Sequence, residues 1–389
     1  MKILYLQWNS FGGDDIILAL RSLGHEVFPF SHPEYNSRDN REFLAYTEQK
    51  LEEVKPDCVF SSNYYSLVSR ACDPHGIPYI SWVYDAPQLF LYSTAVLLPC
   101  NYIFVFDRRT YENFHRSGIN TFYYMPLGAP VRRYDSMEVT SQVHASYDCD
   151  ISFVGALYNE KHNYYNKLVE KLDSYTRSYL EGLMEAQLKI SGDNFIEDCL
   201  TEPIVQKLQE ATPYAPCYDG AETDAYVYAH YFINRKLTEL DRTRTLAALS
   251  EQEKVVLYTF NPTPGLPKVI NRGPLDYVVS MPYAFKCSKI NLNITLRSIT
   301  TGIPLRAFDI MGAGGFLMTN YQADFLDYFI PDEDFVYYES TEDLIDKCHY
   351  YLAHETERAR IARSGYEKVK AHHSYEVRLK EIFDIVFHS

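Results

Sequence analysis

Short apolar runs alternate with longer amphipathic segments through the first third of the chain. The run at residues 2–8 leads into two glycines, and apolar residues then recur at helical spacing until Gly24. Strands that alternate with helices form parallel sheets covered on both faces, so we predict that residues 1–145 form a Rossmann-type domain. Its further strands are expected at residues 26–30, 57–61, 79–83, 102–106 and 121–125.

A second domain of the same type is predicted for residues 150–374. Residues 135–148 lack periodicity and suggest a linker, after which DISFVG (150–155) repeats the strand-to-glycine turn of the amino terminus. Residues 160–253 are mostly helical and longer than one crossover helix, so we expect a helical insertion. Strands are expected again at residues 255–260, 277–279, 290–295, 316–319 and 335–338, and helices from residue 341.

The overall charge limits the partners. The sequence holds 37 Lys and Arg against 52 Asp and Glu, a formal net charge of -15, which repels nucleic-acid backbones and anionic lipids. Nucleic acid is therefore not expected as a partner. The 8 Cys are scattered without metal-binding spacing, and no apolar run has the length of a signal or a membrane span. We expect free thiols, no transmembrane segment and a cytoplasmic protein.

The stretch 290–320 carries the clearest chemical signal, because it has the pattern of strand, loop, helix, glycine turn and strand. Gly302 would lie at the start of the helix, where free N–H groups and the helix dipole favour a diphosphate. Asp309, further along the helix, can accept hydrogen bonds from both hydroxyls of a ribose. An ordinary crossover helix, with Arg306 and Asp309 as a solvated ion pair, explains the same spacing.

The same stretch resembles a known family. RAFDIMGAGGFLMT (306–319) is similar to the R-x-F-E-I-M-A-A-G-G-F-L-L-T signature of the CgeB-like, or spore maturation protein, branch of the group 1 glycosyltransferases. Residues 281–293 and 342–366 resemble flanking motifs, so the resemblance covers about residues 255–385. It implies the GT-B fold, an α/β architecture in which two Rossmann-type domains face a cleft. The nucleotide-sugar donor would bind the second domain, and residues 375–389 would pack back on the first.

The resemblance also assigns residues to the donor. Asp309 falls on the second carboxylate of the family's E-x7-E motif, which binds the nucleotide ribose, whereas Thr301 occupies the position of the first. That missing carboxylate leaves retention or inversion at the sugar carbon open. Arg306 would lie near the diphosphate, with a structural pairing to a carboxylate as the alternative. The other donor-side candidates are Gly302 and Gly155, of which Gly155 lies in the loop beneath the phosphates. Lys161 would bind a phosphate or be a solvated lysine, and Arg272 would lie on the loop that passes the nucleobase.

The amino domain offers candidates for the acceptor side. Phe11, Gly12 and Gly13 follow the first strand, where open α/β sheets bind ligands, although a tight strand-to-helix turn also requires glycine. Tyr84 and Asp85, in WVYDAP, resemble the W-v-x-D-x-P segment of the family. Asp85 can take the proton of an acceptor hydroxyl as a general base, or it can cap a helix.

Together these residues predict a hexosyltransferase-type glycosyltransferase. It would move a sugar from a nucleoside-diphosphate sugar, with UDP-sugars as the leading class, to a glycan or protein acceptor of a cell-surface or glycoprotein pathway. Cations and the helix start would stabilise the leaving diphosphate, and no Asp-x-Asp pair ends an expected strand, so no metal or other cofactor is expected. Two alternatives remain. One is a sugar-nucleotide epimerase of the same fold, and the other is a catalytically silent nucleotide-sugar-binding scaffold protein, suggested by the missing carboxylate.

Overall fold

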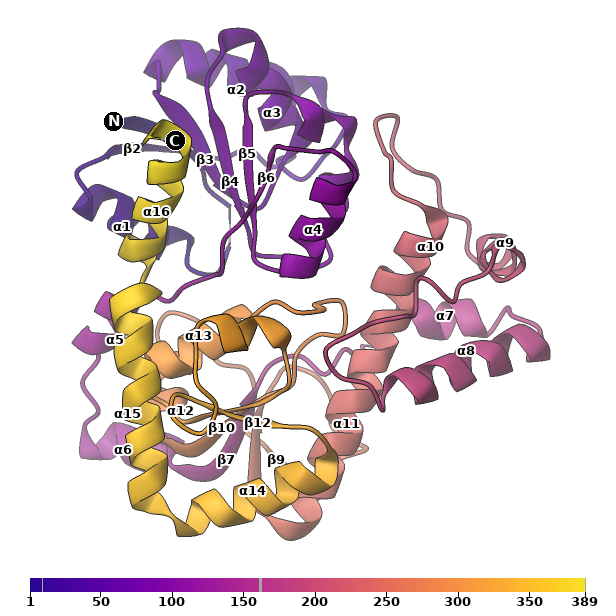
Figure 1. The fold of residues 1–389 in the computed structure, drawn as a ribbon, viewed down its shortest axis with the longest axis vertical. Coiled ribbons are helices and arrows are strands. Elements are labelled where there is room, and N and C mark those ends of the chain that lie inside the picture. Colours follow the sequence, from indigo (N-terminus) through magenta and orange to yellow (C-terminus); the bar gives the residue numbers. More distant parts are fainter. Residues whose placement is uncertain (9, 161–162, 389) are drawn as a thin grey trace. The chain divides into compact units, whose positions relative to one another are not determined.

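The computed structural model describes residues 1–8, 10–160 and 163–388 (Figure 1). Contacts within the chain divide it into two compact units. Unit 1 comprises Met1–Pro130, Ala215–Glu222 and Ala371–Ser389, and unit 2 comprises Val131–Tyr214 and Thr223–Lys370. Each unit contains one six-stranded sheet.

Unit 1 is built on strands β1 (Lys2–Leu6), β2 (Glu26–Phe30), β3 (Cys58–Ser62), β4 (Tyr79–Val83), β5 (Asn101–Val105) and β6 (Phe122–Tyr124). All neighbours pair in parallel, in the order β2-β1-β3-β4-β5-β6. The inner strands β3 and β4 are buried at every position, as a parallel sheet covered on both faces requires. The helices are α1 (Gly13–Ser22), α2 (Arg41–Val54), α3 (Ser66–Cys72), α4 (Arg108–Arg116) and α16 (Tyr375–His388).

The last helix, α16, packs against the first helix of unit 1 (Figure 1). Phe383 of α16 stacks on His25, with ring centroids 4.7 Å apart, and on Phe60 of β3 at 6.5 Å. Gly12, which precedes α1, has a φ of 79°, and a Cβ built there would lie 2.5 Å from the hydroxyl oxygen of Tyr375. The glycine therefore allows both the turn into α1 and the close approach of α16.

The segment Ala215–Glu222 belongs to unit 1, although it lies within the expected helical insertion. The backbone N–H of Thr94 donates to the carbonyl oxygen of Asp219 at 2.9 Å. The guanidinium of Arg38 lies 2.8 Å from Glu222 Oε1 and 3.2 Å from Asp219 Oδ1. All three side chains are buried, so a buried ion cluster holds this segment on unit 1.

Unit 2 is built on strands β7 (Cys149–Val154), β8 (Val255–Tyr258), β9 (Ile270–Asn271), β10 (Ser288–Asn293), β11 (Leu317–Asn320) and β12 (Val336–Tyr338). They pair in parallel in the order β12-β11-β10-β7-β8-β9. The helices are α5 (Val131–Ser136), α6 (Ser141–Tyr147), α7 (Tyr164–Val169), α8 (Ser174–Gln187), α9 (Glu202–Ala211), α10 (Asp224–Val227), α11 (Asn234–Gln252), α12 (Met281–Cys287), α13 (Leu305–Gly312), α14 (Thr341–Ala353) and α15 (Glu355–His372). Apolar residues of the inner strands share one buried core with Leu246 of α11, Leu344 of α14 and Ile361 of α15.

Most predicted strands are confirmed to within two residues at either end. The short strand β9 was not predicted, and two further segments differ from the prediction. Residues 141–147 form helix α6, not part of a linker, because Thr140 Oγ1 caps the helix by accepting from the Val143 N–H at 3.3 Å. Residues 277–279 do not form a strand. Oδ1 of Asp276 accepts from the backbone N–H groups of Val278 and Val279 at 2.9 and 2.7 Å. That carboxylate fixes a turn before α12 in place of strand pairing.

Candidate functional site

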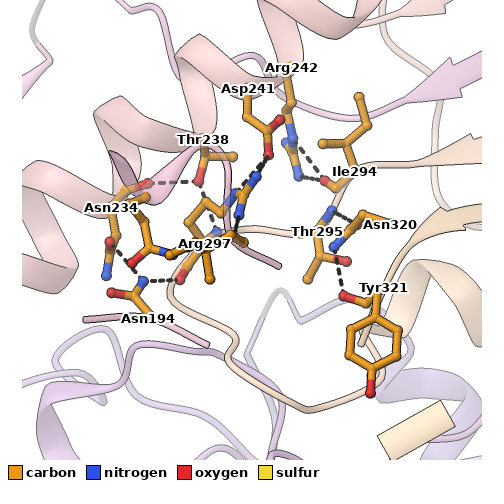
Figure 2. A network of polar contacts seen from close by, with 12 residues as sticks. Asn194, Asn234, Thr238, Asp241, Arg242, Ile294, Thr295, Arg297, Asn320 and Tyr321 are labelled. Carbon is orange, nitrogen blue, oxygen red and sulfur yellow. Dashed lines mark hydrogen bonds and ion pairs between the residues drawn. The ribbon is translucent and has the colours of Figure 1, made fainter. Parts of the chain in front are cut away.

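In unit 2, the carboxyl ends of the parallel strands meet at one edge of the sheet, where open α/β sheets bind ligands. Arg242 of α11 reaches the loops that follow β7 and β10, and Figure 2 shows its contact with the second loop. Its Nη1 donates to the carbonyl oxygen of Ala156 at 2.5 Å, and its Nε and Nη2 donate to that of Ile294 at 3.1 and 2.6 Å. One guanidinium therefore ties the two loops together.

The charge of Arg242 is not balanced by a carboxylate among the residues that the structure describes. Arg242 is 8% exposed, and the neighbouring Asp241 is engaged by Arg297, at 2.7 Å from Asp241 Oδ2. The rings of Phe153 and Tyr158 lie 5.3 and 5.1 Å from the Arg242 guanidinium, and burial lowers its pKa. A buried cation without a partner is costly, so this position favours an anionic ligand.

The loop after β10 has a fixed shape, because side chains from α11, from β11 and from the loop at Asn194 bind it (Figure 2). The backbone N–H of Arg297 donates to Thr238 Oγ1 at 2.9 Å, and its carbonyl oxygen accepts from Asn194 Nδ2 at 2.7 Å. Oδ1 of Asn320 accepts from the Thr295 N–H at 2.8 Å. A small polar hollow lies beside these bonds, lined by residues 191–194, 295–297, 299, 300, 320 and 322.

The start of α13 is held by the loop after β11. As expected, a helix begins just after Gly302. Nε2 of Gln322 donates to the carbonyl oxygen of Gly302 at 3.2 Å, and the backbone N–H of Asp324 donates to that of Thr301 at 3.0 Å. Thr301 and Gly302 therefore precede the helix in a defined position, and the amino end of α13 has no acidic residue in its first turn. This end of the helix can accommodate an anion.

Asp309 lies within α13 and is 1% exposed. Its Oδ1 accepts hydrogen bonds from the hydroxyls of Tyr134 at 2.7 Å and Tyr277 at 3.0 Å. Its Oδ2 lies 3.5 Å from Arg306 Nη1 and accepts no hydrogen bond from the described residues. Burial raises the pKa of Asp309, although Arg306 and the two phenols oppose the shift. The Arg306–Asp309 pair of the alternative explanation forms, but its carboxylate is buried and not solvated.

The other donor-side candidates are in different surroundings. Gly155 follows β7, and a Cβ built there would lie 3.8 Å from Arg242 Nη1. Arg272 uses its guanidinium within unit 2, donating to the Ser146 carbonyl oxygen at 3.1 Å at the carboxyl end of α6 and to the Tyr258 hydroxyl at 3.1 Å. Lys161 lies outside the described residues.

In unit 1, Asp85 follows β4 and is oriented by Asn63, which follows β3. Nδ2 of Asn63 donates to Asp85 Oδ2 at 2.7 Å, and its Oδ1 accepts from the backbone N–H groups of Tyr84 and Asp85 at 2.8 and 3.0 Å. Burial raises the pKa of Asp85, and the bond from Asn63 opposes that shift. The alternative role as a helix cap is wrong, because the next helical turn, Leu89–Tyr92, begins after Gln88.

Phe11, Gly12 and Gly13 form the turn between β1 and α1. Phe11 is 68% exposed, whereas Gly12 is buried and faces Tyr375. Gly13 is the first residue of α1. Gly12 therefore allows the turn and the packing of α16.

Sequence reasoning missed Arg242, the two tyrosines on Asp309, and Asn63. Arg242 carried a readable signal, because it falls on the buried stripe of α11 between Thr238 and Thr245, where a charged residue is unusual. Tyr134 and Tyr277 gave no local signal, since each is far from Asp309 in sequence. In the part of the chain that the structure describes, no group of three or more His, Cys, Asp or Glu side chains could hold a metal ion. No described helix is long and apolar enough to cross a membrane.

Comparison with known proteins identifies the fold. Residues 242–384 match a family described as glycosyl transferase-like. HepE of Anabaena, solved with UDP and glucose, matches over 100% of both chains with a TM-score of 0.56 and 8% identity. A glycosyltransferase of Rickettsia africae and the sucrose-phosphate synthase of Thermosynechococcus elongatus each give a TM-score of 0.53, at 12% and 11% identity, over 100% of this chain and 99% of theirs. No curated protein sequence matches the chain.

These findings confirm the predicted α/β class and the GT-B fold of two Rossmann-like units. The carboxyl region, residues 242–384, is similar to the glycosyl transferase-like family. The matched region includes Arg242, α13 with Asp309, and the helices α14 and α15.

Proposed function

We propose that this protein is a glycosyltransferase that moves a sugar from a nucleoside-diphosphate sugar, with UDP-sugars as the first candidates, to a glycan or protein acceptor. The observation that carries the proposal is Arg242, a buried cation that no acidic side chain of the described residues balances, at the carboxyl edge of a parallel sheet. A diphosphate suits this position, because a guanidinium fork binds phosphate oxygens in pairs. The glycosyl transferase-like match of residues 242–384 supports the same function, and HepE is a structural neighbour solved with UDP-glucose.

In this proposal the donor is bound by unit 2. The diphosphate lies against Arg242, Arg306 and the amino end of α13 at Thr301 and Gly302, with Gly155 allowing close approach. A ribose hydroxyl donates to Oδ2 of Asp309, the carboxylate oxygen that has no hydrogen bond from the described residues. Arg306, whose side chain is 28% exposed, turns from Asp309 toward the phosphates when the donor enters.

Two further residues complete the proposed donor site. Lys161 follows the glycine loop in the sequence and is proposed as a further phosphate partner. The nucleobase passes the backbone near Arg272, because the guanidinium of Arg272 is already bonded to the end of α6.

The proposed reaction needs no metal ion. When the bond from the sugar carbon to the β-phosphate oxygen breaks, negative charge develops on the departing diphosphate. Arg242, the dipole of α13, and Arg306 once it has turned from Asp309 stabilise that charge, which is the role that a divalent cation has in other enzymes. We therefore expect full turnover in EDTA. Loss of turnover in EDTA that Mn²⁺ restores would contradict this part of the proposal.

Asp85 is the proposed general base on the acceptor side. Its carboxylate accepts the proton of the attacking hydroxyl while the hydroxyl oxygen bonds to the sugar carbon. Asn63 positions it, since one side chain bonds both the carboxylate and the backbone of Asp85. Phe11, Gly12, Gly13 and Tyr84 border the acceptor in this proposal.

Two finer assignments belong to the proposal as well. The RAFDIMGAGGFLMT stretch supports membership of the CgeB-like branch, with acceptors in glycoprotein or cell-surface glycan synthesis. All eight cysteines are free thiols, which supports a reducing, cytoplasmic compartment.

The test is to incubate the purified protein with a panel of UDP-, GDP- and TDP-sugars, with and without glycan acceptors, and to analyse the sugar and the nucleotide. Transfer, or slow hydrolysis without an acceptor, supports a glycosyltransferase. Isomerised sugar without an acceptor would identify an epimerase of the same fold. Nucleotide-sugar binding with no turnover of any donor would identify a silent scaffold protein.

A further inference from the structure

Unit 1 contains a hollow at the carboxyl ends of β1 and β2 that is not part of the proposed donor site in unit 2. Its volume is about 490 Å³, and its lining includes Gln7, Trp8, Asp14, His32 and Tyr35. Ligand pockets of proteins usually measure roughly 300–1,000 Å³, so this hollow can hold one or two sugar rings. We call it the Trp8 pocket.

One side of the Trp8 pocket is an aromatic wall held in a fixed position. The rings of Trp8 and Tyr35 stack with centroids 5.6 Å apart and planes 16° apart. Trp8 Nε1 donates to the carbonyl oxygen of Ser62 at 3.1 Å, and Tyr35 meets the ring of Tyr65 edge-on at 5.6 Å. Both wall residues remain partly exposed. A rigid, half-exposed aromatic surface suits the apolar face of a pyranose ring.

The polar side of the pocket selects against anions. Asp14 lies in the first turn of α1, and its Oδ1 accepts from Gln7 Nε2 at 2.8 Å. Asp15 lies in the same turn, so two carboxylates oppose the positive end of that helix. A phosphorylated or otherwise anionic ligand would be repelled, whereas carboxylate oxygens accept hydrogen bonds from sugar hydroxyls.

His32 also lines the pocket and supplies a hydrogen-bond donor. Its ring stacks on Phe43 with centroids 5.1 Å apart, and its Nδ1 accepts from the backbone N–H of Glu34 at 3.2 Å. A neutral imidazole that accepts at Nδ1 carries its proton at Nε2. The pocket thus combines an N–H donor, carboxylate acceptors and an aromatic wall.

The Trp8 pocket lies in the same unit as the proposed general base, and the strands that carry them, β1 and β4, are separated by β3 alone. Trp8 follows β1, Asn63 follows β3 and Asp85 follows β4, and these three strands are consecutive in the sheet. Trp8 bonds the carbonyl oxygen of Ser62, the residue before Asn63, and Asn63 bonds Asp85. A sugar in the pocket is therefore one strand away from the residues that orient the base.

We infer that the Trp8 pocket binds an uncharged pyranose of the acceptor, stacked on Trp8 and Tyr35 and hydrogen-bonded by Asp14 and His32. This inference rests on the proposed function, because it names the acceptor class of the same reaction. The acceptor is thus a neutral glycan or glycoside, not a phosphorylated sugar.

The two tryptophans of the sequence allow a direct test. Trp82 is fully buried, so Trp82→Phe in the full chain leaves Trp8 as the one fluorescent tryptophan. This variant is titrated with the methyl glycosides of glucose, galactose, mannose and N-acetylglucosamine, and with glucose 6-phosphate. The inference predicts a saturable change of Trp8 emission with at least one neutral glycoside, in the millimolar range, and none with the phosphate. Added Tyr35→Ala should weaken that binding about three- to tenfold, and Tyr35→Phe should retain it.

Calorimetry with UDP separates this inference from the proposed function. Tyr35→Ala should leave UDP affinity unchanged, because UDP is bound by unit 2. If UDP binds but no neutral glycoside changes Trp8 emission, or if glucose 6-phosphate binds better, the inference is overturned and the glycosyltransferase proposal stands. If neutral glycosides bind at Trp8 but no nucleotide sugar is bound or turned over, the pocket stands and the proposed function fails.

Discussion

Replacing Arg242 by methionine removes the charge that we assign to the diphosphate and keeps a side chain of similar length. The guanidinium gives three hydrogen bonds to two backbone carbonyl oxygens, of Ala156 and Ile294, so three of its five N–H donors are used in the protein. The remaining two are available for phosphate oxygens. A charge-assisted hydrogen bond contributes about 1.5–3 kcal/mol, so UDP affinity should fall roughly ten- to hundredfold.

The same substitution has two opposing effects on stability. The buried carbonyl oxygen of Ile294 and the partly buried one of Ala156 lose their donors, which costs up to about 1–3 kcal/mol each. Removing a buried cation that lacks an acidic partner stabilises the fold and offsets part of that loss of stability. Arg242→Lys is therefore measured beside Arg242→Met, since lysine keeps the charge but not the planar fork, and it should retain more UDP affinity than methionine.

The UDP affinity of each variant is measured by isothermal titration calorimetry in EDTA, and circular dichroism verifies that the variant is folded. Arg244→Met is the matched control, because Arg244 lies on the same helix and forms an ion pair with Glu185 at 2.6 Å, with both side chains 53% exposed. Exposed pairs contribute little, so this control should leave both UDP affinity and stability unchanged. A folded Arg242→Met protein that binds UDP as tightly as the wild type would refute the assignment.

Three further predictions address the base, the ribose contact and the buried ion cluster. Asp85→Asn should lower transfer at least about a hundredfold with UDP affinity unchanged, and a normal transfer rate in this variant would remove Asp85 from catalysis. Because burial raises the pKa of Asp85 above its ordinary 3.8, the wild-type kcat/KM should fall as the pH falls through that raised pKa. Asp309→Ala should weaken UDP about ten- to hundredfold in calorimetry, and unchanged affinity would place the ribose elsewhere. Arg38→Met removes the guanidinium that faces Asp219 and Glu222, so urea unfolding should show a loss of about 3–5 kcal/mol, whereas a loss below about 1 kcal/mol would show that the cluster does not stabilise unit 1.

Local sequence patterns were sufficient for most of the fold. The strands at Glu26–Phe30 and Tyr79–Val83 are predicted to the residue, because apolar residues there are bounded by polar residues or proline. The pair Val278 and Val279 misleads, since β-branched residues favour strands but the carboxylate of Asp276 takes their backbone N–H groups. Helix α6 was missed because it is short and none of its side chains is buried to set a periodicity.

The candidate site was predictable only in part. The sequence places Gly302 at a helix start and pairs Arg306 with Asp309, since both depend on spacing within one helix. It does not reveal that Tyr134 and Tyr277 cover Asp309, because those contacts depend on how distant segments pack. Burial of Asp309 is therefore a tertiary property.

A crystal structure of the protein with UDP, grown in EDTA, tests the central claim most directly. The account predicts phosphate oxygens within about 2.7–3.2 Å of the guanidinium nitrogens of Arg242 or Arg306, beside the amino end of α13, and a ribose hydroxyl on Asp309. Phosphates bound at another part of the chain, or no bound nucleotide at saturating UDP in a folded protein, would contradict it.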